Sequence, residues 1–146
     1  MAVFGWPAGD LVQAITIVYN VCKALKDIGG ASDDYQEIVA FLYSLAITLD
    51  ALRTFDGVLA SPGDVASIRA QVDLVQEPVQ KFTKKIESKF EPNLGTQVTK
   101  GVRKAVRGWH RKAQWALWVS KEAKALGEKI AIPLCAIQIK VGLQAL

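Results

Sequence analysis

The residues of this 146-residue chain with the clearest potential for chemistry are basic, and they gather between positions 100 and 111. They recur mainly at steps of three and four residues, and they are Lys100, Arg103, Lys104, Arg107 and Arg111. Apolar residues of the same segment recur at steps of four, three and four, and they are Val102, Val106, Trp109 and Ala113. A helix over residues 96–119 would therefore carry a charged face opposite an apolar one.

Three interpretations of this basic face are open. Residues 1–80 hold four basic and ten acidic side chains and residues 81–146 hold fourteen and four, so the basic face could simply pair with the acidic half and face water. Alternatively it meets anionic headgroups, with Trp109, Trp115 and Trp118 at the membrane interface. Nucleic acid is the least favoured partner, because no recognition module accompanies the charge.

Catalytic, cofactor and metal sites are not predicted. The sequence contains no glycine-rich phosphate loop, no paired histidines and no serine elbow. His110 is the single histidine and is expected to be solvated, while the carboxylates are scattered. Cys22 and Cys135 lie in apolar helical stretches, which predicts two buried free thiols. We therefore expect a protein that is not an enzyme.

Length and composition indicate one folded domain over residues 1–146. The chain is 51% hydrophobic and 22% charged, far from the composition of disordered proteins. No charge-free run after the opening reaches the roughly 18 to 20 residues of a spanning helix, and no signal peptide is evident. The expected location is cytoplasmic, and the expected fold is an all-α bundle of four to five helices.

The first helix is predicted to be apolar over much of its circumference. Trp6-Pro7 excludes helix upstream, Asp10 is the expected cap, and Gly29-Gly30 is a strong stop. Between them, apolar residues follow helical spacing and form a wide stripe: Leu11, Ala14, Ile15, Ile17, Val18, Val21, Cys22 and Leu25. Such a helix is either wrapped by other helices or placed in lipid.

The remaining helices are predicted from caps, prolines and apolar stripes. The predicted stripes are Ile38, Phe41, Leu42, Leu45, Leu49 and Leu52 in the second helix, Val65, Ile68, Val72, Val75, Val79, Phe82 and Ile86 in the third, and Ala123, Leu126, Ile130, Leu134, Ile137 and Val141 in the last. A second helix should begin at one of the N-cap candidates Ser32, Asp33 and Asp34 and finish near Phe55, and Ser61-Pro62 should cap and begin a third. Pro78 falls inside the third helix and predicts a kink or a break. Ser120 is expected to cap the last helix, which Pro133 should bend.

The opening of the chain is the candidate membrane element. Its large apolar side chains either form a hydrophobic staple that closes the bundle or enter lipid when the first helix is released. The membrane-interaction candidates are Val3, Phe4, Trp6, Leu11, Ile15 and Val18.

Four motifs resemble the N-terminal helical domains of filamentous-fungal signalling proteins. They are FGWPAGDL at residues 4–11, GGASDDYQE at 29–37, LYSL at 42–45 and QWALW at 114–118. The relatives have an FG-x-x-x-GD opening and a GAS-x-x-YQE helix start, and they look related to the HeLo-like cell-death domains. Pro7 beside Trp6 departs from the pattern and restricts how far the first helix extends upstream.

The resemblance implies a function that residue chemistry alone does not supply. In the HeLo-like group, oligomerisation frees the N-terminal helix to disturb membranes, so residues 1–25 would be the effector element. The implied partners are anionic membrane lipid, further copies of the chain and a downstream ubiquitin-like or nucleotide-binding signalling domain, with movement to the membrane on activation. The alternative function is a soluble interaction or oligomerisation module without membrane activity.

Overall fold

The computed structural model describes residues 2–29, 33–55, 61–94 and 102–145, with side chains over 4–27, 35–55, 61–88 and 114–142. Four helices make up nearly all of this part, namely α1 (Ala8–Gly29), α2 (Asp33–Thr54), α3 (Pro62–Leu94) and α4 (Val102–Ala145). A short hairpin of β1 (Ala2–Val3) and β2 (Trp6–Pro7) precedes α1. The prediction of an all-α fold with four to five helices is confirmed.

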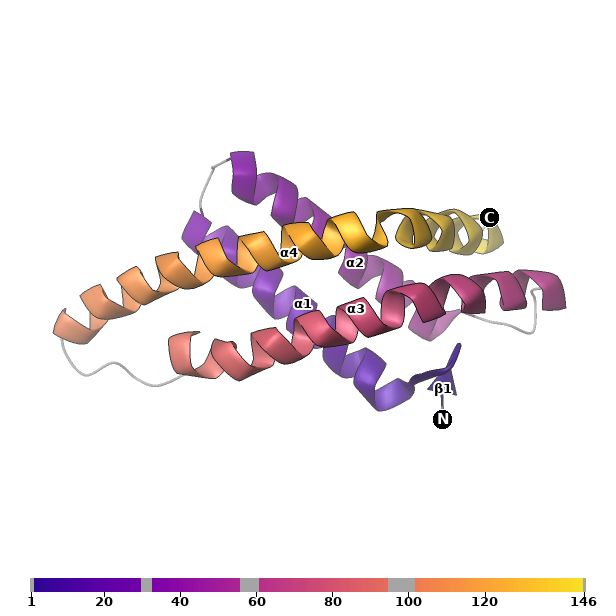
Figure 1. The fold of residues 1–146 in the computed structure, drawn as a ribbon, viewed down its shortest axis with the longest axis horizontal. Helices are drawn as coiled ribbons and strands as arrows, with labels where there is room; N and C mark the ends of the chain where they lie inside the picture. Colours follow the sequence, from indigo (N-terminus) through magenta and orange to yellow (C-terminus); the bar gives the residue numbers. More distant parts are fainter. Residues whose placement is uncertain (1, 30–32, 56–60, 95–101, 146) are drawn as a thin grey trace.

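The helices are arranged in two layers (Figure 1). α3 and α4 lie side by side along the long axis of the molecule, and α1 and α2 form a second pair that crosses them. α2 also packs against α4, where Gln138 donates hydrogen bonds to the hydroxyl oxygens of Ser44 (2.7 Å) and Thr48 (3.0 Å). The two layers bury one continuous hydrophobic core between them.

The predicted apolar stripes supply this core. α1 contributes the inner side of its wide stripe, α3 contributes every third or fourth residue between Ile68 and Ile86, and α4 contributes the series from Ala123 to Ile137. Each fully buried Val, Leu, Ile or Phe side chain stabilises the fold by about 1.5–3 kcal/mol. Helical periodicity was therefore sufficient to predict most of the core.

The start of α3 follows its predicted cap. The Ser61 hydroxyl oxygen accepts a hydrogen bond from the Asp64 amide at 3.2 Å, and the Ser61 carbonyl accepts one from the Val65 amide at 3.1 Å. Pro62 occupies the first helical position, where its missing N–H leaves no bond unmade.

The N-terminal hairpin was not predicted. Ala2 pairs with Pro7 and Val3 with Trp6, and the two turn residues both have positive φ, 52° at Phe4 and 86° at Gly5. Two positive φ values in a two-residue turn suit the right-handed twist of a hairpin. Glycine adopts this conformation freely, whereas Phe4 does so at a cost, so Phe4-Gly5 is not a recognisable hairpin-turn pair in the sequence.

Two predictions about the long helices need correction. α4 runs without interruption from Val102 to Ala145, so Ser120 is not an N-cap, and its hydroxyl instead donates to the Ala116 carbonyl at 2.7 Å. The helix continues because the buried stripe of Trp115, Val119 and Ala123 crosses this point without a breaker. Of the kink and the break predicted as alternatives at Pro78, the break does not occur, since α3 runs through this residue as α4 runs through Pro133.

Candidate functional site

The predicted membrane-interaction residues lie in the N-terminal hairpin and in α1, and those that are described pack into the closed bundle or against its core. Trp6 and Val18 are 0% exposed, Leu11 is 1% exposed, Ile15 is 8% exposed and Phe4 is half-buried. The side chain of Val3 lies outside the described side chains. In this state the described ones pack in or against the hydrophobic core, and any role for the buried ones in lipid, which stays a prediction, requires α1 to leave the bundle.

The hairpin fastens the start of α1 to two other helices. The Phe4 ring lies 5.5 Å from the ring of Phe55, centroid to centroid, just after the end of α2. At Gly5, an added Cβ would lie 3.5 Å from the Arg69 guanidinium of α3. Trp6 is fully buried, and its Nε1 has no hydrogen-bond partner among the described residues. The opening is thus a docked element held mainly by apolar packing.

The basic-face candidates lie outside the described side chains. Lys100 precedes α4, and Arg103, Lys104, Arg107 and Arg111 belong to its helical backbone. Of the three tryptophans expected at a membrane interface, Trp115 is instead buried at 3% exposure, Trp118 is half-buried and the side chain of Trp109 is undescribed.

Three ion pairs among the described residues bear on the charge asymmetry of the chain. Arg53–Asp50 (2.9 Å) and Lys81–Glu77 (3.0 Å) each lie within one helix, and Lys85–Glu122 (3.3 Å) joins α3 to α4. None of these three joins α1 or α2 to the other layer, and only Lys81–Glu77, one turn apart within α3, pairs a residue of the acidic half with one of the basic half. The hydrogen bond and charge of Lys81 also lower the pKa of the Glu77 carboxyl.

Within the described residues, no three His, Cys, Asp or Glu side chains gather where they would hold a metal ion. Both cysteines are free thiols. The prediction of burial is confirmed for Cys22 and wrong for Cys135, which is exposed because it lies on the side of α4 away from the core.

The most distinctive surface of the described bundle is apolar and belongs to α1 and α2. Tyr19 and Tyr43 are 38% and 52% exposed, and their rings meet edge to face with centroids 6.1 Å apart. Two further apolar side chains are also exposed. Val12 lies two turns before Tyr19 on α1, and Ile47 lies one turn after Tyr43 on α2. We call these four residues the α1–α2 face.

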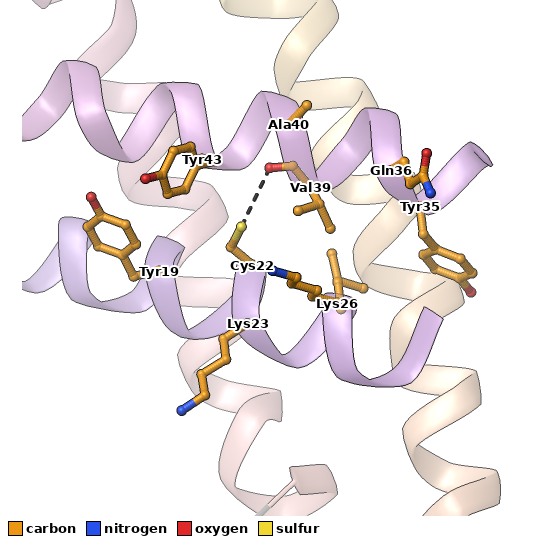
Figure 2. A pocket seen from close by; sticks show the side chains of 10 residues that line it. Tyr19, Cys22, Lys23, Lys26, Tyr35, Gln36, Val39, Ala40 and Tyr43 are labelled. Atoms are coloured by element: carbon orange, nitrogen blue, oxygen red, sulfur yellow. Dashed lines mark hydrogen bonds between the residues drawn. The ribbon is translucent and has the colours of Figure 1, made fainter. Parts of the chain in front are cut away.

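A groove continues from this face between the two helices (Figure 2). It has a volume of about 630 Å³ and opens to solvent. Figure 2 shows the Tyr19–Tyr43 pair toward one end and Tyr35 at the other, with Cys22 and Val39 between them. The groove-lining residues are Tyr19, Cys22, Lys23, Leu25, Lys26, Tyr35, Gln36, Val39, Ala40 and Tyr43.

Cys22 marks the floor of the groove. Its thiol donates a hydrogen bond to the Val39 carbonyl at 3.5 Å, which ties α1 to α2. Burial raises the pKa of the Cys22 thiol, and the positive charge of Lys26 offsets part of that rise. The thiol is therefore protonated at neutral pH and is a poor nucleophile. The groove is better suited to binding than to catalysis.

A second groove of about 690 Å³ lies between α2 and α4. It is lined by both lysines and glutamates, and Gly127 of α4 approaches the Phe41 ring there, with 3.5 Å between that ring and an added Cβ. A smaller hollow of about 390 Å³ between α3 and α4 is bordered by Lys81, Lys85 and Lys129 beside Glu122. Both carry mixed charge, which makes them less selective surfaces than the groove between α1 and α2.

One helix of the described chain is long and apolar enough to span a membrane. It is Tyr35–Thr54 of α2, with a mean hydropathy of 1.2. Charge-free run length had predicted none. The core helix of a water-soluble bundle passes the same test, and α2 packs Leu42, Leu45 and Leu49 fully into the core. The finding therefore adds only that α2 is long and apolar in composition.

No protein-family model, curated protein or solved structure matches this chain. The resemblance to fungal N-terminal helical domains consequently stays a prediction. Sequence reasoning missed Tyr19, Tyr43 and Ile47 as candidate site residues. For Tyr19 a signal was available, because Val12, Tyr19 and Lys23 are spaced by seven and four residues and so share one side of α1, flanking the stripe chosen as the core.

Proposed function

We propose that this chain is a non-enzymatic signalling domain that binds anionic membranes through its N-terminal helix, α1. The observation that carries the proposal is that α1 is apolar on two sides, one buried in the core and one exposed at Val12 and Tyr19. A role in cell death or immunity rests on the motif resemblance alone. The α1–α2 face adds an aromatic pair beside two exposed lysines, Lys23 and Lys26.

The energies favour contact through the exposed side of α1 before any release of its buried side. Taking Trp6, Leu11, Ile15 and Val18 out of the core would cost about 1.5–3 kcal/mol each, or roughly 6–12 kcal/mol together. That is comparable to the whole stability of a typical domain, about 5–15 kcal/mol. Release of α1 therefore needs a further driving force such as insertion or oligomerisation, whereas docking of the α1–α2 face needs none.

The face has the composition of a membrane-interface surface. Tyrosine rings are favoured at the headgroup level because one end is apolar and the other polar. Each lysine near an anionic surface contributes about 1 kcal/mol. Tyr19, Lys23 and Lys26 lie on one side of α1, so a single orientation would bring the aromatic pair and both charges to the same plane.

Liposome sedimentation and dye leakage test the proposal. Vesicles rich in phosphatidylserine should bind the chain, and neutral vesicles should bind it less. The double variant Tyr43→Glu/Ile47→Glu places two negative charges on exposed positions and should weaken binding roughly tenfold or more, since about 2 kcal/mol is lost. Leu74→Glu on α3, where Leu74 is 60% exposed, is the matched control and should bind normally.

A buried substitution separates docking from release. Leu11→Ala should lower stability by about 2–5 kcal/mol and leave vesicle binding by the folded protein unchanged if the exposed face makes the contact. Anionic vesicles that stay intact and free of protein at every concentration tested would refute membrane binding altogether.

The alternative function, a soluble self-association module, is supported by a different surface. Ile132 and Ile139 of α4 are 84% and 57% exposed, with the exposed Cys135 between them on the same side of the helix. Light scattering distinguishes the two functions. A concentration-dependent oligomer that Ile132→Lys dissociates, together with no response to lipid, would favour this alternative.

A further inference from the structure

The groove between α1 and α2 has the shape of a site for one extended apolar chain. Its lining on α2 runs from Tyr35 to Tyr43, eight helical steps and therefore about 12 Å. Its volume of about 630 Å³ lies in the range of ligand sites, about 300–1,000 Å³. Apolar side chains border it along this length, and the Tyr19–Tyr43 pair stands toward one end.

The charge of the groove selects one class of head group. Its described lining residues include Lys23 and Lys26 and no carboxylate. Figure 2 shows Lys26 lying along the groove with its ammonium toward Cys22, whereas Lys23 points away from α2. Neither lysine takes part in an ion pair with another described residue. A ligand here meets an apolar trough with an ammonium group beside it.

We propose that this groove binds a single-chain anionic lipid, with the acyl chain over Cys22 and Val39 and the anionic head group at the Lys26 ammonium. The site deepens the proposed membrane function and rests on it for its biological context. A bundle resting on a membrane through the α1–α2 face would hold the groove at the boundary between head groups and acyl chains. A lipid tail could then cover apolar groove surface that is otherwise exposed to water.

Cys22 allows occupancy to be measured at the site itself. The full chain carrying Cys135→Ser has one thiol, on the groove floor, and its alkylation by a small maleimide can be followed by mass spectrometry. Dodecyl phosphate, kept below its micelle concentration, is the probe. Dodecyltrimethylammonium and inorganic phosphate are the controls for charge and for the apolar chain.

Dodecyl phosphate should slow alkylation of Cys22 at least fivefold, and neither control should do so. Lys26→Gln should weaken the apparent affinity for dodecyl phosphate about tenfold, the value of one charged contact. Lys129→Gln on α4 is the matched control and should leave it unchanged. Ala40→Phe fills the groove from an exposed helical position and should abolish protection by dodecyl phosphate while the circular dichroism spectrum and thermal midpoint are retained.

Several results would overturn the site. They are no protection by dodecyl phosphate, equal protection by the cationic amphiphile, or undiminished protection by dodecyl phosphate in folded Ala40→Phe. Vesicle sedimentation separates this failure from that of the proposed function. If the chain binds anionic vesicles but dodecyl phosphate does not slow the alkylation of Cys22 by the maleimide, the groove site alone is refuted. A chain that binds dodecyl phosphate in the groove and ignores vesicles keeps the site and refutes membrane docking.

Discussion

Trp6 provides the sharpest test of how the opening of the chain is held. Its side chain is 0% exposed, and its Nε1 is buried without a hydrogen-bond partner among the described residues. Two opposing contributions therefore meet in one residue: a large apolar surface that stabilises the fold and a polar group that destabilises it. Trp6→Phe and Trp6→Ala separate the two.

The magnitudes of the two substitutions should differ clearly. Trp6→Ala removes nearly all the packing, and such a change costs about 3–5 kcal/mol. Trp6→Phe keeps most of the ring, so cavity formation and lost transfer energy cost roughly 1–3 kcal/mol. It also removes the buried N–H group, whose desolvation costs about 1–3 kcal/mol. These contributions nearly cancel, and Trp6→Phe should change stability by less than about 1 kcal/mol.

Urea unfolding followed by far-ultraviolet circular dichroism measures both variants. Far-ultraviolet signal reports the helices and is insensitive to the loss of one tryptophan. A stability loss above about 3 kcal/mol for Trp6→Phe would show that the N–H group is satisfied in the folded protein and would refute the reasoning. A loss below about 1 kcal/mol for Trp6→Ala would show that the hairpin is not docked as described.

Three further predictions concern a turn glycine, a helix glycine and the two thiols. Gly5→Ala should destabilise the fold by about 1–2 kcal/mol, because φ at this position is 86°. Gly142→Ala should stabilise it by about 0.5–1 kcal/mol, because an added Cβ meets no atom within 4 Å and the helix loses less entropy; urea midpoints check both. Cys135 should be alkylated before Cys22 at neutral pH, and Cys22 should react only as pH rises, because burial raises its pKa. Because folding raises the pKa of the Cys22 thiol, its contribution to the free energy of unfolding is fully present below the thiol pKa of the unfolded chain and is lost as pH rises through the thiol pKa of the folded chain. Urea unfolding of the Cys135→Ser variant across alkaline pH should reveal this loss.

The sequence by itself determined the helices and most of the core. An apolar side chain at every third or fourth position is sufficient to predict the buried side of a helix, because the helical repeat brings such positions to one side whichever element packs against it. The stripe of α3 from Ile68 to Ile86 is buried as predicted. Local capping is equally predictable from sequence, since Ser61 accepts hydrogen bonds from backbone amides in the first turn of α3 that are only three and four residues away.

The uninterrupted course of α4 and the N-terminal hairpin depended on tertiary packing. The buried stripe through Trp115 and Val119 carries α4 past Ser120, a residue that would cap a helix in other surroundings. The positive φ of Phe4 is unfavourable locally, and the packing of Phe4 on Phe55 and the burial of Trp6 accompany it. Such contacts join residues about 50 positions apart, which no local rule relates.

The candidate site shows most clearly which features the sequence determines and which depend on tertiary packing. The sequence determined that α1 is a helix with a wide apolar circumference, and periodicity correctly placed Leu11, Ile15 and Val18 together. The spacing of Val12, Tyr19 and Lys23 marked a second side of α1, but it did not determine how much of that side would remain outside, because exposure depends on where the other helices pack. Only the approach of α2 left Tyr19 beside Tyr43 and opened the groove at Cys22, since a surface between two helices exists only once both are packed.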